Sequence, residues 1–221
     1  MNVFVGFFAP LTIALGLWQL DRGALKREME MSYLDKLTTL PVAPTQASLR
    51  TDFQRVRVTG RFEDEYFLVD NQILSGDTGY WVVQVFEAEG DRYLVNRGFV
   101  AGPASRDQLP SVAWPDEEIR ITGVVWPFTG LIPVFDDDVW TAGWPKRVQR
   151  LDIARMAATI DALPVELRLE GGQPGVLHAA PFAQVLSDAK HRGYAATWFG
   201  LFLALMILYF YFAWREKIGN D

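Results

Sequence analysis

The sequence contains no cysteine, only two histidines and a deficit of positive charge. The absence of cysteine excludes disulfides, thiolate catalysis and zinc ribbons. A single chain cannot build a multi-histidine metal site from His178 and His191 alone. The formal net charge is −6 at pH 7, all of it carried by residues 21–193. Because an acidic domain repels phosphate backbones, we expect no nucleic-acid partner.

Sequence patterns of common enzymes are also missing. No serine lies in a nucleophile-elbow pattern, neither histidine has a motif partner, and no phosphate-binding glycine loop occurs. Residues 136–138 are three consecutive aspartates, a residue type that chelates hard cations, but neighbouring residues of a strand cannot all point at one ion. We therefore predict a solvated acidic loop there and a protein that is not an enzyme.

Charge is absent from two long runs, one near each end of the chain. Residues 3–20 are 18 uncharged residues, or ~27 Å of helix, and residues 194–214 are 21 uncharged residues, or ~32 Å. Both lengths match a bilayer, and the first run lacks the basic start and cleavage pattern of a removable signal. We predict two transmembrane helices at 3–20 and 194–214, one extramembrane domain at 21–193 and a short polar tail at 215–221.

The charges that flank the two runs do not assign the domain to one side of the membrane. Six lysines and arginines lie near the bilayer on the loop side and two on the other side. This difference favours a loop on the inner side, but loops longer than roughly 60 residues escape the positive-inside rule. Charge alone leaves the orientation open.

The loop predicts a sheet with a few helices. The pattern first continues as a helix over 22–37, and Asp152 is placed to cap a short helix over 153–160. Between and after these helices, the apolar residues of 56–62 alternate with polar ones, as in a half-buried strand. Further strands are predicted at 66–70, 80–86, 93–100, 119–126 and 165–169, with turns at 75–77 and 89–91. We therefore expect a membrane protein of the α+β class, with a mostly antiparallel sheet for which an open barrel is one form and with short helices.

Two of these segments resemble one another. Val56-Arg57-Val58-Thr59-Gly60 has the same pattern as Ile119-Arg120-Ile121-Thr122-Gly123. Two ordinary strands with the same alternation are the simpler explanation, and duplicated halves of one sheet are the alternative.

A set of side chains with ligand-binding potential lies where the two apolar runs meet the loop. Trp18 and Arg22 share a face of the first helix, and His191, Tyr194 and Trp198 have helical spacing in the second. One imidazole, an aromatic surface and a guanidinium suit a planar metal-containing tetrapyrrole, because the histidine supplies an axial bond and the cation holds a propionate. An interfacial anchor or a helix cap explains the same histidine, so both interpretations stay open.

Several motifs together resemble the surfeit-locus-one family. The first motif is Leu15-Gly16-Leu17-Trp18-Gln19-Leu20-Asp21-Arg22 with Lys26, and the last is His191 with Tyr194-Ala195-Ala196-Thr197-Trp198-Phe199-Gly200. Between them lie Val58-Thr59-Gly60-Arg61-Phe62, Gly79-Tyr80 and Val95-Asn96-Arg97-Gly98. The resemblance covers nearly the whole chain, and the two terminal motifs are its more specific part.

This resemblance implies an assembly factor for cytochrome c oxidase and related haem-copper oxidases. It implies a multi-pass protein of the bacterial inner membrane with a periplasmic domain, or of the mitochondrial inner membrane in a eukaryote. It also implies haem a as a transient cofactor during assembly of the catalytic subunit, with His191 as its ligand. Membrane lipid, the catalytic subunit of the oxidase and other assembly factors are the expected partners.

Two further alternatives follow from individual residues. Small residues at 193, 195, 196 and 200 permit close helix contact, so a cofactor-free scaffold that holds an assembly intermediate is the alternative function. Arg97, in the Asn-Arg-Gly motif, is either a functional residue or a buried, paired arginine beside a turn at Gly98. His178, in a proline- and glycine-rich connection, is expected to be an exposed loop residue.

Overall fold

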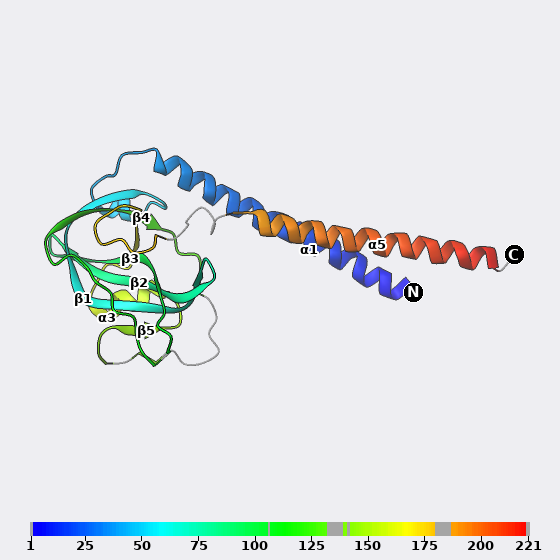
Figure 1. Cartoon of the computed structure of the whole chain (residues 1–221). Coiled ribbons are helices and arrows are strands. Elements are labelled where there is room, and N and C mark those ends of the chain that lie inside the picture. Colours follow the sequence, from blue (N-terminus) through cyan, green and yellow to red (C-terminus); the bar gives the residue numbers. More distant parts are fainter. Residues whose placement is uncertain (1, 106, 132–138, 141, 180–186, 220–221) are drawn as a thin grey trace. The chain divides into compact units, whose positions relative to one another are not determined.

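The computed structural model describes residues 2–105, 107–131, 139–140, 142–179 and 187–219 (Figure 1). The chain divides into two compact units, one formed by Met1–Leu34 with Pro181–Asp221 and the other by Asp35–Ala180. The first unit is helical and the second is built around a sheet. The predicted acidic loop at residues 136–138 lies outside the described residues.

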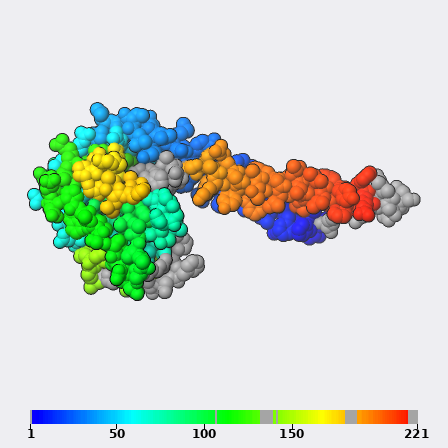
Figure 2. All heavy atoms as spheres, in the orientation of Figure 1, coloured from blue at the N-terminus to red at the C-terminus, as the bar shows by residue number. Residues whose placement is uncertain are grey.

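The helical unit contains α1 (Asn2–Leu37) and α5 (Ala189–Gly219), and its part of α1 ends at Leu34. Both are long and apolar enough to cross a membrane. Large apolar side chains such as Phe7 and Phe210 are each 62% exposed, as expected for helices whose surroundings are lipid rather than water. Figure 2 shows the orange-to-red spheres of α5 beside the blue spheres of α1.

The helix predicted over residues 22–37 is a direct continuation of the first apolar run. At 36 residues, α1 is ~54 Å long, whereas the apolar core of a bilayer is ~30 Å thick. A helix that crosses the membrane with its uncharged part therefore extends well beyond it. The second helix begins at Ala189, so His191 lies in its first turn, as the spacing of the aromatic residues required.

The sheet unit has a closed ring of strands. Its strands are β1 (Arg55–Leu74), β2 (Asp77–Ala88), β3 (Asp91–Ala101), β4 (Ile119–Trp126), β5 (Lys146–Val148) and β6 (Glu166–Leu169). Their order is β2-β3-β6-β4-β1-β5, and β1 also pairs with β2, which closes the ring. Four pairings are antiparallel, and β5 and β6 each join one neighbour in parallel. The prediction of a mostly antiparallel sheet is confirmed, and the sheet is more completely closed than an open barrel.

Strand β1 differs most from the prediction, because the segments 56–62 and 66–70 form one strand of 20 residues. Its pairing with β2 shifts register between Phe62 and Tyr66, where three acidic residues interrupt the alternation. Its first half pairs with β4 and its second half with β2. The turns that follow, at Ser75-Gly76 and Glu89-Gly90, both have positive φ at their two central residues, as tight hairpins require.

The two segments with similar sequences pair with each other. Val58 of β1 lies opposite Ile121 of β4, and Gly60 lies opposite Ile119. The inward residues of both, Val56, Val58, Ile119 and Ile121, belong to one buried cluster. Their common alternation therefore reflects their paired position in the sheet, where Val56, Val58, Ile119 and Ile121 all face the same cluster.

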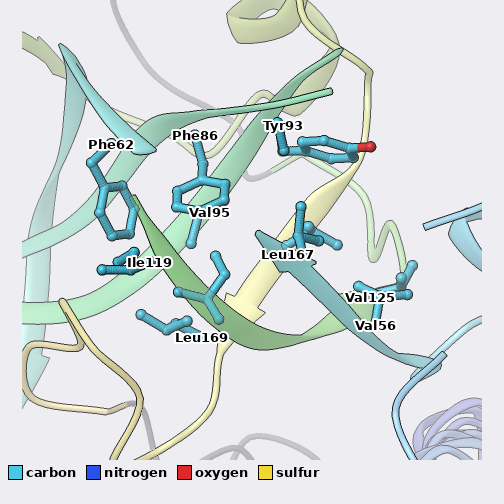
Figure 3. Close-up of a cluster of buried hydrophobic side chains, with 12 residues drawn as sticks. Val56, Phe62, Phe86, Tyr93, Val95, Ile119, Val125, Leu167 and Leu169 are labelled. Atoms are coloured by element: carbon cyan, nitrogen blue, oxygen red, sulfur yellow. The ribbon is translucent and has the colours of Figure 1, made fainter. Parts of the chain in front are cut away.

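The interior of the ring is filled by aromatic and branched side chains from five strands (Figure 3). Phe62 and Phe86 meet edge to face with ring centroids 4.9 Å apart. A second cluster lies under α3 (Ile153–Ile160), whose buried residues are Met156, Ala157 and Ile160. The predicted cap of this helix is confirmed, because the carboxylate of Asp152 accepts a hydrogen bond from the backbone N–H of Arg155 at 3.1 Å. The short helix α2 (Gln46–Leu49) was not predicted.

Candidate cofactor site on the helical hairpin

The helices α1 and α5 pack against each other in antiparallel directions through small residues. Gly23 lies beside His191, because a Cβ added to this glycine would be 3.4 Å from the Cβ of the histidine. Seven residues earlier, a Cβ added to Gly16 would be 2.6 Å from the ring of Phe199. Ala195, between these two contacts, is 2% exposed. Glycines thus let the two backbones approach, as is common for helices in membranes.

One hydrogen bond joins the two helices at the histidine. Nδ1 of His191 lies 2.8 Å from Oε1 of Gln19. With the amide oxygen of Gln19 facing the ring, this contact is a hydrogen bond in the tautomer that carries the proton on Nδ1 and keeps the lone pair on Nε2. Among the described residues, Nε2 has no hydrogen-bond partner. The histidine is therefore oriented and leaves one ring nitrogen free to bind a metal ion.

A buried carboxylate fixes the start of α5. Asp188, directly before the helix, is 8% exposed and lies 3.4 Å from Nε of Arg27 on α1 and 3.2 Å from Nε of Arg192. A negative charge at a helix N-terminus is favourable, and here it also links the two helices. The Arg27–Asp188 ion pair and the Gln19–His191 hydrogen bond lie on either side of Gly23. Together these contacts hold the register of the hairpin.

The other predicted site residues lie on one side of this hairpin. Arg22 follows the interface residue Gln19 by three positions, and Tyr194 follows His191 by three positions. In an antiparallel pair of helices, residues that follow an interface residue by three positions on each helix lie on the same side of the pair. Trp198 follows the interface residue Ala195 by three positions and falls on this side as well.

The structure brings some of these side chains into contact and leaves others apart. The guanidinium of Arg22 lies 5.8 Å from the ring centre of Trp18, within range of a cation–π interaction. Trp18 is 51% exposed and Tyr194 is 58% exposed, while Trp198 is half-buried. The side therefore presents open aromatic surface beside the histidine, and its role in binding stays a prediction.

Comparisons with known proteins show the family of the chain. A model of the SURF1 family matches residues 6–203, which include most of α1, the whole sheet unit and the first half of α5. The chain belongs to the SURF1 family. It is 27% identical to a SURF1-like protein of Rickettsia felis over 94% of each chain. It is 24% identical to Surfeit locus protein 1 of Gallus gallus over 91% of this chain and 72% of that one.

The SURF1 family is a family of oxidase assembly factors rather than of enzymes. The chain is a membrane protein, because it belongs to this family and has two helices that are long and apolar enough to cross a membrane. Among the described residues, no group of three or more histidine or acidic side chains could enclose a metal ion. A haem fits, because the described hairpin offers one oriented imidazole, open aromatic surface and a cation.

Arg97, in the Asn-Arg-Gly motif of this SURF1 chain, is a buried residue of the sheet unit. It is 1% exposed, Nε donates to the carbonyl of Gly175 at 2.6 Å, and the terminal nitrogens donate to Oε1 of Gln84 and, at 2.7 Å, to the carbonyl of Ala113. Burial lowers the pKa of Arg97 to about 10, which still leaves it charged at pH 7. Arg97 thus joins three segments of the chain, and the structure favours the structural alternative.

Two details near Arg97 differ from the sequence prediction. Gly98 lies inside β3 at a shift of register, with φ +110, rather than in a turn, and a Cβ there would be 2.4 Å from the carbonyl oxygen of His178. The side chain of His178 is exposed as predicted, but its backbone pairs with Phe99.

Gln19 is the functional candidate that sequence reasoning did not assign to the site. It belongs to the first family motif and lies three residues before Arg22, but an amide has no distinctive spacing pattern. Gly16 and Gly23 could have pointed to Gln19 from the sequence, since small residues seven positions apart mark the face of α1 that contacts another helix.

We predict that Gly16→Leu separates the two helices, because the larger side chain cannot fit against Phe199. Gly6→Leu is the matched control, since a Cβ at Gly6 would meet no described atom within 4 Å. Paired cysteines introduced at Gly23 and His191 into this cysteine-free chain measure the approach of the helices by disulfide formation, since a Cβ at Gly23 would lie 3.4 Å from the Cβ of His191. We expect cross-linking in the Gly6→Leu background and its loss with Gly16→Leu. Equal cross-linking in both would contradict the packing.

Proposed function

We propose that the protein is an assembly factor for cytochrome c oxidase that binds haem a on the helical hairpin and aids its insertion into the catalytic subunit. The observation that carries this proposal is the orientation of His191 by Gln19, which leaves Nε2 available beside open aromatic surface. Membership of a family of oxidase assembly factors supports it. In this proposal, haem a is a cargo that the protein holds and releases.

Each site residue has a distinct task in this proposal. Nε2 of His191 would bind the iron, which haem a would bring. Tyr194, Trp198 and Trp18 would cover apolar surface of the macrocycle, and Arg22 would pair with a propionate. The protein would offer a single bond to the iron, and Trp18 and Tyr194 are exposed, which favours transient holding over permanent storage.

The proposal includes the location of the protein. We infer a multi-pass protein of the bacterial inner membrane, with the sheet unit on the periplasmic side and both chain ends on the cytoplasmic side. The partners are the catalytic subunit of the oxidase, other assembly factors and membrane lipid. A cysteine-accessibility assay with a cysteine placed at exposed Gly171 reports on the side of the membrane that the sheet unit occupies.

We expect His191→Ala to lower the haem a content of the protein at least about tenfold. Loss of a group that only orients a metal ligand already costs about 10- to 100-fold in affinity, and loss of the ligand itself should cost no less. The full chain is expressed in cells that make haem a and purified in detergent, and haem per protein is measured by absorption. His178→Ala is the matched control, because it removes the only other histidine, an exposed residue of the sheet unit. Unchanged haem content in His191→Ala would remove this residue from the mechanism.

A cofactor-free scaffold is the second candidate function, and one observation favours it. Gly193 and Gly200, seven residues apart on α5, would each accept a Cβ with no described atom within 4 Å. This open small-residue face is compatible with close contact to a helix of the oxidase subunit. Capture of the catalytic subunit by the haem-free His191→Ala variant supports the scaffold. Loss of that capture together with the haem supports the haem carrier.

A further inference from the structure

The hydrogen bond between Gln19 and His191 has a chemical consequence for the free nitrogen. A neutral imidazole in water carries its proton mainly on Nε2, the nitrogen that a metal ion would need to be unprotonated. An acceptor placed at Nδ1 reverses this preference, because it is satisfied only when Nδ1 is protonated. In this hairpin the acceptor is Oε1 of Gln19, 2.8 Å from Nδ1.

We propose that Gln19 is a positioning residue that holds His191 in the tautomer protonated on Nδ1, before any ligand binds. The part of this inference that concerns haem rests on the proposed function. The tautomer itself does not, since the two helices alone provide the geometry. Gln19 therefore prepares Nε2 as an electron-pair donor, and binding needs no proton transfer or ring rotation.

The neighbours of this pair hold both side chains in place. A Cβ added to Gly23 would lie 3.4 Å from the Cβ of His191, so the start of the histidine side chain lies close to the α1 backbone. Asp188, three residues before His191, is held by Arg27 of α1. With the backbone fixed on both sides, the half-buried amide of Gln19 is within reach of Nδ1. The contact is thus a property of the hairpin register rather than of one flexible side chain.

The proposal makes opposite predictions for two substitutions of similar size. Gln19→Glu keeps an oxygen acceptor at the same distance and, being charged, donates more electron density to the ring through the hydrogen bond. Gln19→Leu removes the acceptor and leaves Nδ1 without this partner. The first variant should preserve the tautomer and the second should lose it.

The first test uses nitrogen-15 NMR of the haem-free full chain in detergent at pH 8.5, where imidazoles are neutral. Because the chain has only two histidines, labelling histidine alone gives two ring systems, and exposed His178 serves as the internal reference. We expect His191 to be protonated on Nδ1 in the wild type and in Gln19→Glu, and on Nε2 in Gln19→Leu. A wild-type His191 protonated on Nε2, or a tautomer unchanged in Gln19→Leu, would overturn the proposal.

The second test titrates ferric haem a into the same three proteins and into His191→Ala. We expect binding to weaken by about 10- to 100-fold in Gln19→Leu and to remain within about threefold of wild type in Gln19→Glu. The midpoint potential of the bound haem should fall in Gln19→Glu, a shift that a purely structural role would not produce.

The outcomes separate this inference from the proposed function. If His191→Ala abolishes binding and Gln19→Leu does not weaken it, the haem site stands and the positioning role is wrong. If His191→Ala binds as well as wild type, the proposed ligand is wrong, whereas the NMR result still decides the tautomer.

Discussion

Replacing Arg97 by methionine should destabilise the sheet unit by about 3 kcal/mol, equivalent to a fall of about 10 °C in Tm. Methionine fills similar space but donates no hydrogen bond, so Oε1 of Gln84 and the carbonyls of Gly175 and Ala113 lose their donor. Each buried acceptor left unpaired costs about 1–3 kcal/mol, and relief from burying a cation offsets only part of that sum.

Thermal unfolding of the full chain in detergent, followed by tryptophan fluorescence and circular dichroism, measures this change. Arg57→Met is the matched control, because Arg57 is exposed on β1 of the same sheet and should change stability by less than about 0.5 kcal/mol. If Arg97→Met melts like the wild type while oxidase assembly fails, Arg97 acts on a partner and the structural explanation is wrong.

Gly60→Ala should also be severe, with a loss of more than about 4 kcal/mol or no recovery of folded protein. A Cβ at Gly60 would lie 1.9 Å from the backbone carbonyl oxygen of Glu87 in β2. Backbone atoms of a sheet cannot move aside as a flexible side chain can. Gly60 is also the last residue of β1 that pairs with β4, directly before Arg61 pairs with β2. The substitution therefore acts at the corner where one strand changes partners.

Gly171→Ala provides the comparison, since a Cβ there would meet no described atom within 4 Å and its φ lies outside the left-handed region. Yield of folded protein and Tm are measured for both variants side by side. Equal stability of the two alanine variants would show that β1 and β2 do not approach as closely at this corner as the structure has them.

The elements that alternate regularly could be predicted from the sequence, and those that depend on distant neighbours could not. Strand β4 follows the predicted bounds 119–126 because its apolar face is uninterrupted. The fusion of two segments into β1 was missed, since residues 63–65 are all acidic and the register shift there is set by β2. Strand β5 has only three residues and shows no periodicity of its own.

The sequence proposed members for the candidate site, whose role stays a prediction, but not the hydrogen bond between Gln19 and His191. Helical spacing was enough to place Arg22, Tyr194 and Trp198 on chosen faces. Which residue of α1 meets His191 depends on the register of two helices that are about 170 residues apart in sequence. That register is set by glycine contacts and by the Arg27–Asp188 ion pair, which no local pattern reveals.

The place of β6 in the closed ring has a consequence for biosynthesis. Strand β6 lies between β3 and β4 in the ring, although it is the last strand to be synthesised. The ring can close only after residue 169 has left the ribosome, when the first transmembrane helix has long been available for insertion. Until then, β3 and β4 carry unpaired edges that other chains could join. The sheet unit should consequently fold in one late cooperative step, and chains truncated before β6 should aggregate or be degraded at the membrane.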